Sequence, residues 1–374
     1  MNPTLRTHPW VLAALLAAAC AGQQAVTSGA IAEVTVPGWR LSPAATIGGA
    51  DARADQQLYT VTSVADDPEG RMYVVNFGDK RVAVFDSAGV FVRNLGRAGR
   101  GPGEFLTPSR VAVAGPEAWV LDVRHGRVSR FRRSDGGHVG DLPLRVGAGL
   151  RVSDIKTTPD GRLFVEVRPL RTGRSRGAVQ PRVVEVDTAT GTARHAAAVP
   201  LDTVSQVEVR TATGPDRGIA RVMDIPFAPR PVWAVDPDGV VLFGNGAEYV
   251  VRSMGDGRVG ELFRAAGERS PVTAWDREEL FEEPMLKPFR GKVKLPKRKP
   301  FFTSLLADGD RVWVALPTSR EGQRWEVRDR GGRLLGELRL APRARLAHVS
   351  STAAYVVTMA DDLETLRRYS LRRG

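Results

Sequence analysis

RMYVVN, at residues Arg71–Asn76, is the first of six copies of one short apolar pattern. The later copies are EAWVLD (117–122), RLFVEV (162–167), VVLFGN (240–245), RVWVAL (311–316) and AAYVVT (353–358). In five copies an aromatic ring occupies the third place, as Tyr73, Trp119, Phe164, Trp313 and Tyr355, whereas the fourth copy has Leu242 there and Phe243 beside it. Such self-similarity indicates a repeat architecture, and six repeats made of strands predict an all-β, six-bladed β-propeller.

The segments around each copy have the composition of antiparallel strands joined by tight turns. RWEVRD (324–329) alternates apolar and polar residues, as strands do when one face is buried. Asp67–Gly70 (DPEG) has the residues of a turn, because Asp or Pro initiates the bend and glycine tolerates positive φ. Each unit therefore predicts a four-stranded blade, and the contact between neighbouring blades is the predicted core.

The sixth unit has room for only three strands, between about Leu346 and Arg372. Trp39–Ile47 (WRLSPAATI), at the other end of the chain, can supply the fourth. Closing the ring in this way removes open sheet edges, which otherwise favour aggregation. The propeller is therefore predicted to span residues 39–374. The alternative is that the N-terminal strand packs elsewhere.

One passage resembles a known repeat family. LGRAGRGPGEFLTPSRVAV (95–113) followed by AWVLDVRHGRVSRF (118–131) is similar to the NHL repeat, with its Gly-rich loop, Phe, Pro and apolar strands. From Trp39 onward the chain resembles bacterial six-bladed propellers of NHL type, many of them predicted lipoproteins. The resemblance implies the fold but not the activity, because this fold hosts binding modules, lactonases and lyases.

Residues 1–19 have the features of a secretory signal peptide. Arg6 and His8 precede the apolar run Val11–Ala19, which is shorter than the roughly 20 residues needed to span a bilayer. LLAAAC (15–20) resembles the lipobox of bacterial lipoproteins, and Cys20 is the one cysteine of the chain. We predict that Cys20 is lipidated, that residues 20–38 form a flexible tether, and that the protein is exported and anchored to a membrane on its periplasmic or surface side. The alternative is an ordinary cleaved signal in which the cysteine is incidental.

Three segments interrupt the rhythm of the repeat, at about residues 168–181, 202–229 and 270–300. Within the third, Ala274–Phe281 is predicted to form a short helix capped by Thr273. Insertions of this kind lie on a face of a propeller, which is where function usually resides.

Positive charge concentrates in two of these segments, and the chain has a formal net charge of +12. The candidate binding residues are Arg171, Arg174 and Arg176 in the first segment and Lys292, Lys294, Lys297 and Arg298 in the last. Such loops attract a protein partner or an anionic ligand through long-range electrostatics. The alternative is that they are simply solvated. Nucleic acid is not expected as a partner, because the signal directs the protein out of the cytoplasm.

The sequence shows little that indicates catalysis. Asn76, Asp122 and Asn245 end three of the repeated strands and are weak candidates for a metal site in the axial channel. We expect them instead to bond to their own turns, since the equivalent residues in the other copies are Val167, Leu316 and Thr358. The four histidines outside the signal, His125, His138, His195 and His348, have no paired-ligand spacing, and His125 is expected to be structural. The domain has no Gly-x-Ser-x-Gly motif.

The sequence therefore favours an exported, lipid-anchored, monomeric propeller that binds a ligand or protein through its loop faces, without catalysis and without a cofactor. The alternative is a metal-dependent hydrolase or lyase of the lactonase kind, with Ca²⁺ or Zn²⁺ in the axial channel.

Overall fold

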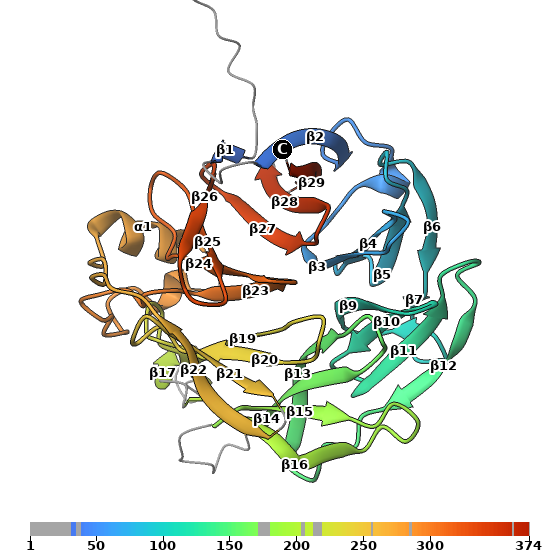
Figure 1. Cartoon of the computed structure of the whole chain (residues 1–374), viewed down its shortest axis with the longest axis horizontal. Helices are drawn as coiled ribbons and strands as arrows, with labels where there is room; N and C mark the ends of the chain where they lie inside the picture. Colours follow the sequence, from blue (N-terminus) through green and yellow to red (C-terminus); the bar gives the residue numbers. More distant parts are fainter. Residues whose placement is uncertain are drawn as a thin grey trace, which may run out of the picture.

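The computed structural model describes residues 31–34, 39–170, 180–202, 206–211, 219–255, 257–283, 286–360 and 363–373. Six four-stranded antiparallel blades surround a central axis, which confirms the predicted all-β, six-bladed propeller (Figure 1). The repeated apolar pattern forms the second strand of every blade.

The blades are numbered in chain order, and their strands run from the axis outward. Blade 1 contains β3 (Val61–Asp66), β4 (Met72–Asn76), β5 (Arg81–Phe85) and β6 (Phe91–Leu95). Blade 2 contains β9 (Pro108–Ala114), β10 (Glu117–Asp122), β11 (Arg127–Arg132) and β12 (His138–Pro143). Blade 3 contains β13 (Leu150–Thr157), β14 (Leu163–Pro169), β15 (Arg182–Val186) and β16 (Ala193–Pro200).

Blade 4 contains β19 (Val232–Val235), β20 (Val241–Gly244), β21 (Val250–Gly255) and β22 (Arg258–Arg264). Blade 5 contains β23 (Ser304–Asp308), β24 (Arg311–Ala315), β25 (Arg324–Asp329) and β26 (Leu334–Leu340). Blade 6 contains β27 (Ala344–Val349), β28 (Ala353–Ala360), β29 (Leu363–Arg373) and the N-terminal β2 (Trp39–Gly48).

The ring is closed by β2, as the sequence predicted. This strand pairs antiparallel with β29, from Trp39 opposite Arg373 to Gly48 opposite Thr365. A second N-terminal strand, β1 (Ile31–Val34), pairs with β26 and gives blade 5 a fifth strand. These residues belong to the predicted tether, so that prediction is wrong for Ile31–Val34. Ile31 packs against the apolar core between blades 5 and 6, and β1 covers the edge that β26 would otherwise expose.

The core consists of the interfaces between neighbouring blades, as predicted. Each third-place residue of the repeat fills a different interface: Tyr73 (blades 1 and 2), Trp119 (2 and 3), Phe164 (3 and 4), Leu242 (4 and 5), Trp313 (5 and 6) and Tyr355 (6 and 1). Leu242 therefore keeps the repeat position in blade 4, whereas Phe243 packs into the interface on the other side of that blade. The repeated pattern thus reflects the need for one large apolar side chain in each interface between blades.

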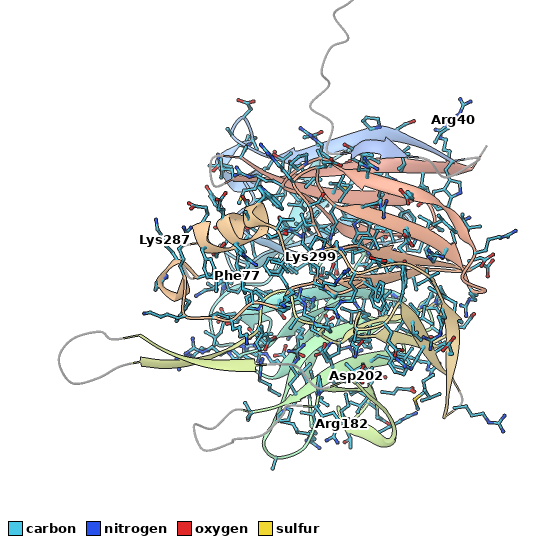
Figure 2. All side chains as sticks on the ribbon, turned by 90° about the vertical axis from the view of Figure 1, so that its left-hand side faces the viewer. Arg40, Phe77, Arg182, Asp202, Lys287 and Lys299 are labelled. Carbon is cyan, nitrogen blue, oxygen red and sulfur yellow. The ribbon has the colours of Figure 1, made fainter. Side chains whose placement is uncertain are left out.

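The two faces of the ring have different connections. Because successive strands alternate in direction, turns joining first to second and third to fourth strands lie on one face, here called the short-turn face. Connections between blades, and between second and third strands, lie on the opposite long-loop face. In Figure 2 Lys287, in the insertion before blade 5, lies on the same side of the ring as Phe77, which is in the connection between the second and third strands of blade 1. This side is the long-loop face, and Arg40 lies on the opposite side.

The insertions contain the remaining elements. The segment 202–229 forms a hairpin of β17 (Gln206–Thr211) and β18 (Ile219–Asp224), and 270–300 contains α1 (Ala274–Glu282) and the 3-10 turn η2 (Lys287–Phe289). Thr273 caps α1 as predicted: its hydroxyl accepts from Asp276 N at 3.2 Å, and the Asp276 carboxylate accepts from Thr273 N at 2.8 Å. Shorter elements are η1 (Ala54–Gln56) and the parallel pair β7 (Arg97–Ala98) and β8 (Glu104–Phe105). Among the described helices, none is long and apolar enough to cross a membrane.

Candidate ligand site in the axial cavity

A cavity of about 1280 Å³ lies among the inner strands of the ring. Its wall includes residues of all six inner strands, β3, β9, β13, β19, β23 and β27. Small-molecule sites commonly occupy roughly 300–1,000 Å³, so this cavity has room for an extended ligand.

One position of the inner strand recurs around the cavity. It pairs across the sheet with the third-place residue of the repeat, and it is Ala65, Ala112, Lys156, Ala234, Leu306 and His348 in blades 1 to 6. At this position blades 3 and 6 have Lys156 and His348, whereas the other four blades have Ala or Leu. In a six-membered ring these blades are opposite, so the two basic side chains come from opposite walls of one cavity.

His348 belongs to a cluster around the carboxylate of Asp66, which joins the first blade to the last. Asp66 Oδ1 accepts from His348 Nε2 at 2.9 Å, and Oδ2 accepts from Ser350 Oγ at 2.7 Å and Tyr355 Oη at 2.8 Å. The His348 and Tyr355 rings stack with their centroids 5.5 Å apart. The side chain of His348 remains 28% exposed, so it is accessible from the cavity.

The protonation states of this cluster follow from burial and from these bonds. Burial alone would raise the pKa of Asp66, but the hydrogen bonds and the charge interaction with His348, together with Ser350 and Tyr355, lower it below its ordinary value. Burial and the negative charge of Asp66 raise the pKa of Tyr355 above its ordinary value. Asp66 is therefore a carboxylate that accepts, Tyr355 is a phenol that donates, and the Asp66 bond holds the hydrogen of His348 on Nε2.

Lys156 belongs to a second cluster, shared by blades 2, 3 and 4. Its Nζ lies 3.6 Å from Asp154 Oδ2 and 5.0 Å from the centre of the Trp233 ring. Asp154 Oδ1 also accepts from Arg110 Nε at 2.7 Å. Trp233 Nε1 donates to Glu166 Oε2 at 3.0 Å. The charged groups of Lys156, Asp154 and Arg110 are therefore partnered by one another.

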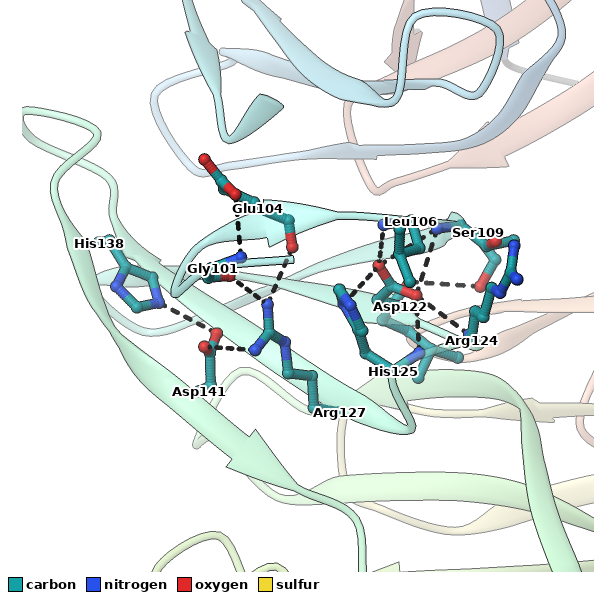
Figure 3. A network of polar contacts seen from close by, with 12 residues as sticks. Gly101, Glu104, Leu106, Ser109, Asp122, Arg124, His125, Arg127, His138 and Asp141 are labelled. Atoms are coloured by element: carbon teal, nitrogen blue, oxygen red, sulfur yellow. Dashed lines mark hydrogen bonds and ion pairs between the residues drawn. The ribbon is translucent and has the colours of Figure 1, made fainter. Parts of the chain in front are cut away.

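The weak metal candidates are hydrogen-bonded within their own turns and, for Asn76 and Asp122, also to the connection that precedes the blade. Asn76 Oδ1 accepts from Tyr59 N at 2.8 Å, and Asn245 Oδ1 accepts from Ala247 N at 2.8 Å. Figure 3 shows Asp122 bound by backbone N–H groups of the Gly-rich loop and of its own turn, including Leu106 N at 2.6 Å. These oxygens are occupied as acceptors, so they do not fit a shared metal site. In the described part of the chain, no group of three or more His, Cys, Asp and Glu could hold a metal ion.

The same view explains His125 and the Gly-rich loop (Figure 3). His125 Nδ1 lies 3.1 Å from Asp122 Oδ2, a contact within one turn, which supports the structural role expected for it. Gly101 N donates to Glu104 Oε2 at 2.9 Å, and Arg127 Nη2 donates to the carbonyl oxygens of Gly101 and Glu104. The polar groups of this loop are used within blade 2 and its connection.

The structure describes four of the seven basic candidate residues. Arg171, Arg174 and Arg176 lie outside the described residues. Lys292, Lys294, Lys297 and Arg298 are exposed on the insertion before blade 5, away from the axial cavity. Arg298 donates to Arg269 O at 2.6 Å and lies 3.6 Å from Glu268.

Sequence reasoning missed Asp66, Lys156 and His348 as cavity residues. The residue types at the inner-strand position carry a signal, but they lie outside the repeated six-residue pattern. The inner-strand position is seven or eight residues before each third-place residue. Aligning the six copies at that offset would have shown Lys156 and His348 among alanines and a leucine.

Comparison with known proteins agrees with the fold. A family model described as a 6-bladed beta-propeller, DUF5128, matches residues 55–132. No curated protein matches the chain. Similar solved structures include a "putative exported protein" from Bacteroides fragilis, at 10% identity and TM-score 0.52, covering 92% of this chain and 97% of that chain. Another is a member of the DUF4221 family from Bacteroides vulgatus, at 10% identity and TM-score 0.52, covering 91% and 99%. At such identities the likeness shows the fold alone.

Proposed function

We propose that this chain is an exported, lipid-anchored propeller of NHL type that binds, without catalysis, a polar ligand in its axial cavity. The observation that supports binding is the cavity of about 1280 Å³ with Lys156 and His348 on opposite walls. Both replace residues that the repeat elsewhere keeps small or apolar, so the fold itself does not require them.

The chemistry of the wall favours a neutral ligand rich in hydroxyl groups, such as a short oligosaccharide. Asp66 and Asp154 are each partnered by donors of the protein, and Lys156 lies between Asp154 and Trp233. An acidic ligand would compete with Asp154 for Lys156, whereas hydroxyl groups can share these fixed donors and acceptors.

Export and anchoring are supported by the N-terminal sequence. The apolar run Val11–Ala19 and the single Cys20 have the order of a signal and a lipidation site. The likeness in fold to a Bacteroides fragilis protein named as exported agrees with this proposal.

Calorimetric titration of the chain from residue 20, with Cys20 replaced by serine, tests the ligand class. The probes are short neutral malto-, cello- and xylo-oligosaccharides and their acidic counterparts. We expect binding of at least one neutral probe, weakened tenfold or more by Lys156→Met and by His348→Leu, with Lys80→Met as the matched control outside the cavity. Binding that prefers acidic probes, or binding that is insensitive to both cavity substitutions, would contradict the proposal.

A hydrolase or lyase is the second candidate, and the pair His348–Asp66 is the observation that favours it. A carboxylate that binds one ring nitrogen orients the imidazole, and such a pair is a common arrangement in general acid–base catalysis. Elemental analysis of the purified chain tests the metal-dependent form of this candidate. A stoichiometric divalent ion would favour that form over simple binding.

A further inference from the structure

We propose that the long-loop face of the ring lies against the membrane, where the basic segment Lys287–Arg298 contacts anionic lipid headgroups. The proposal rests on the lipid anchor at Cys20 that belongs to the proposed function. It assigns an orientation to the anchored ring, which the position of a lipidated cysteine alone does not define.

After the anchor, the chain joins the ring at β1. Ile31, the first residue of β1, pairs with Leu340, the last residue of β26. As the fourth strand of blade 5, β26 runs from the short-turn face to the long-loop face, so Ile31 lies at the rim of the long-loop face. Ile31 also packs against the core between blades 5 and 6, which fixes this point to the ring.

The length of chain between the anchor and β1 limits the distance of the ring from the membrane. Ten residues, 21–30, separate Cys20 from Ile31. At no more than about 3.5 Å per residue, they span at most about 35 Å. A short connection attached at the rim of the long-loop face favours orientations in which that face is near the lipid surface.

The basic segment lies beside the point where β1 joins the ring. Arg343, in the connection that follows β26, has its Nε 3.9 Å from Glu279 Oε1 of α1. Phe281 of α1 packs with Phe289 and Val293, which hold the basic segment against the helix. The attachment of β1, the helix α1 and the basic segment are therefore neighbours on one sector of the ring.

The charges of this segment suit a headgroup surface. Residues 287–298 contain six Lys and Arg and no acidic residue. Lys292, Lys294 and Lys297 are exposed, and the described structure shows no ion pair for these three ammonium groups. The apolar side chains of Phe289 and Val293 are buried beneath them. Clusters of four to eight basic residues close to a membrane bind anionic lipids.

An acidic protein is the competing partner for the same charges. The anchor decides between them, because it keeps the segment permanently close to lipid, whereas a protein partner has to be supplied by diffusion. A polybasic surface is also the usual second signal that strengthens a lipid anchor.

A chemically anchored chain tests the orientation independently of processing in the cell. Cys20 is the one thiol of the chain, so the chain from residue 20 can be coupled to a maleimide lipid in phosphatidylcholine vesicles with or without phosphatidylglycerol. Lysine acylation followed by mass spectrometry then measures exposure. We expect Lys292, Lys294 and Lys297 to react at least severalfold more slowly on the anionic vesicles. A lysine introduced on the short-turn face by Arg258→Lys should react equally on both.

Equal reactivity of the three lysines on both vesicles would overturn the proposal. Failure of the cell to lipidate Cys20 would instead leave this result unchanged and would contradict only the proposed anchor, so the two failures are distinguishable.

A pair of charge-matched variants tests the contact without any anchor. In the Cys20→Ser chain, Lys292→Ser/Lys294→Ser/Lys297→Ser should lower affinity for phosphatidylglycerol vesicles by about fivefold per lysine removed. Arg40→Ser/Arg258→Ser/Arg372→Ser removes the same charge from exposed residues of the short-turn face and should leave affinity nearly unchanged. Equal losses would show that net charge alone acts, and binding of polyglutamate in preference to the vesicles would assign the surface to an acidic protein. Either result contradicts the proposal, provided that circular dichroism shows both variants folded.

Discussion

Tyr355→Phe tests whether the cluster around Asp66 stabilises the junction of the first and last blades. The substitution removes one hydroxyl from a ring with no exposed surface and leaves its packing intact. Asp66 then loses the donor at 2.8 Å but keeps His348 at 2.9 Å and Ser350 at 2.7 Å. A hydrogen bond to a charged group contributes about 1.5–3 kcal/mol, and because two donors remain we expect the free energy of unfolding to fall by about 1.5–2 kcal/mol.

The lowered pKa of Asp66 also predicts how the effect of Tyr355→Phe on stability changes with pH. The folded-state pKa of Asp66 lies below its ordinary value of 3.8, so its contribution to stability is complete above that value. The contribution is lost as pH falls through the lower, folded-state pKa. The difference between wild type and Tyr355→Phe should therefore be largest near neutral pH and should shrink in acid.

Urea unfolding at several pH values, followed by tryptophan fluorescence, measures both the loss of unfolding free energy and its dependence on pH. Tyr73→Phe is the matched comparison, because Tyr73 donates to Asp67 at 2.9 Å, and Asp67 retains Arg71 at 2.8 Å and Arg133 at 3.2 Å. We expect the Tyr73 substitution to cost less, since two cations still neutralise that carboxylate. A loss below about 0.5 kcal/mol for Tyr355→Phe, or a loss that does not change with pH, would refute the assigned role of Asp66.

Three further substitutions test other parts of the molecule. Cys20→Ser should release the protein from membranes in cell fractionation, and continued membrane association would contradict lipidation. Asp276→Asn leaves the ammonium group of Lys299, 5% exposed and 2.5 Å from the Asp276 carboxylate, without its counter-charge. It should cost about 3 kcal/mol in urea unfolding, part of which Lys299→Met should restore in the double variant. Gly191→Ala should lower the thermal unfolding temperature more than Gly161→Ala. Both glycines have positive φ, but a Cβ at residue 191 would lie 1.9 Å from Pro143 O, whereas nothing lies within 4 Å of a Cβ at residue 161. Equal losses would show that backbone conformation alone decides.

The blade architecture was predictable because one physical requirement recurs in the sequence. Every interface between blades needs a large apolar side chain from the second strand, and Tyr73 and Trp313 show that requirement directly. The closing strand was predictable by subtraction, because the last unit lacked an outer strand. β1 was not, since the small and polar residues around Ile31–Val34 resemble a linker, and the edge of β26 that they cover is visible only in three dimensions.

The cavity residues were harder to predict for a different reason. His348 and Asp66 are separated by most of the chain and meet only because the ring brings blade 6 beside blade 1. A histidine with no nearby ligand in sequence gives no indication of such a partner. The three candidate residues Asn76, Asp122 and Asn245, in contrast, have partners in their own turns or in the adjoining loop, which are near them in the sequence.

The pairing of β2 with β29 has a consequence for biogenesis. The ribosome makes β2 before any other strand of blade 6, and its partner is among the last segments to be synthesised. Individual hairpins can form as they emerge, but the joint between the two ends of the chain requires the whole polypeptide and a long loop closure. The ring therefore cannot close before β29 is synthesised. A truncated product without β29 would expose two unpaired sheet edges, of β2 and of β28, and such edges favour aggregation.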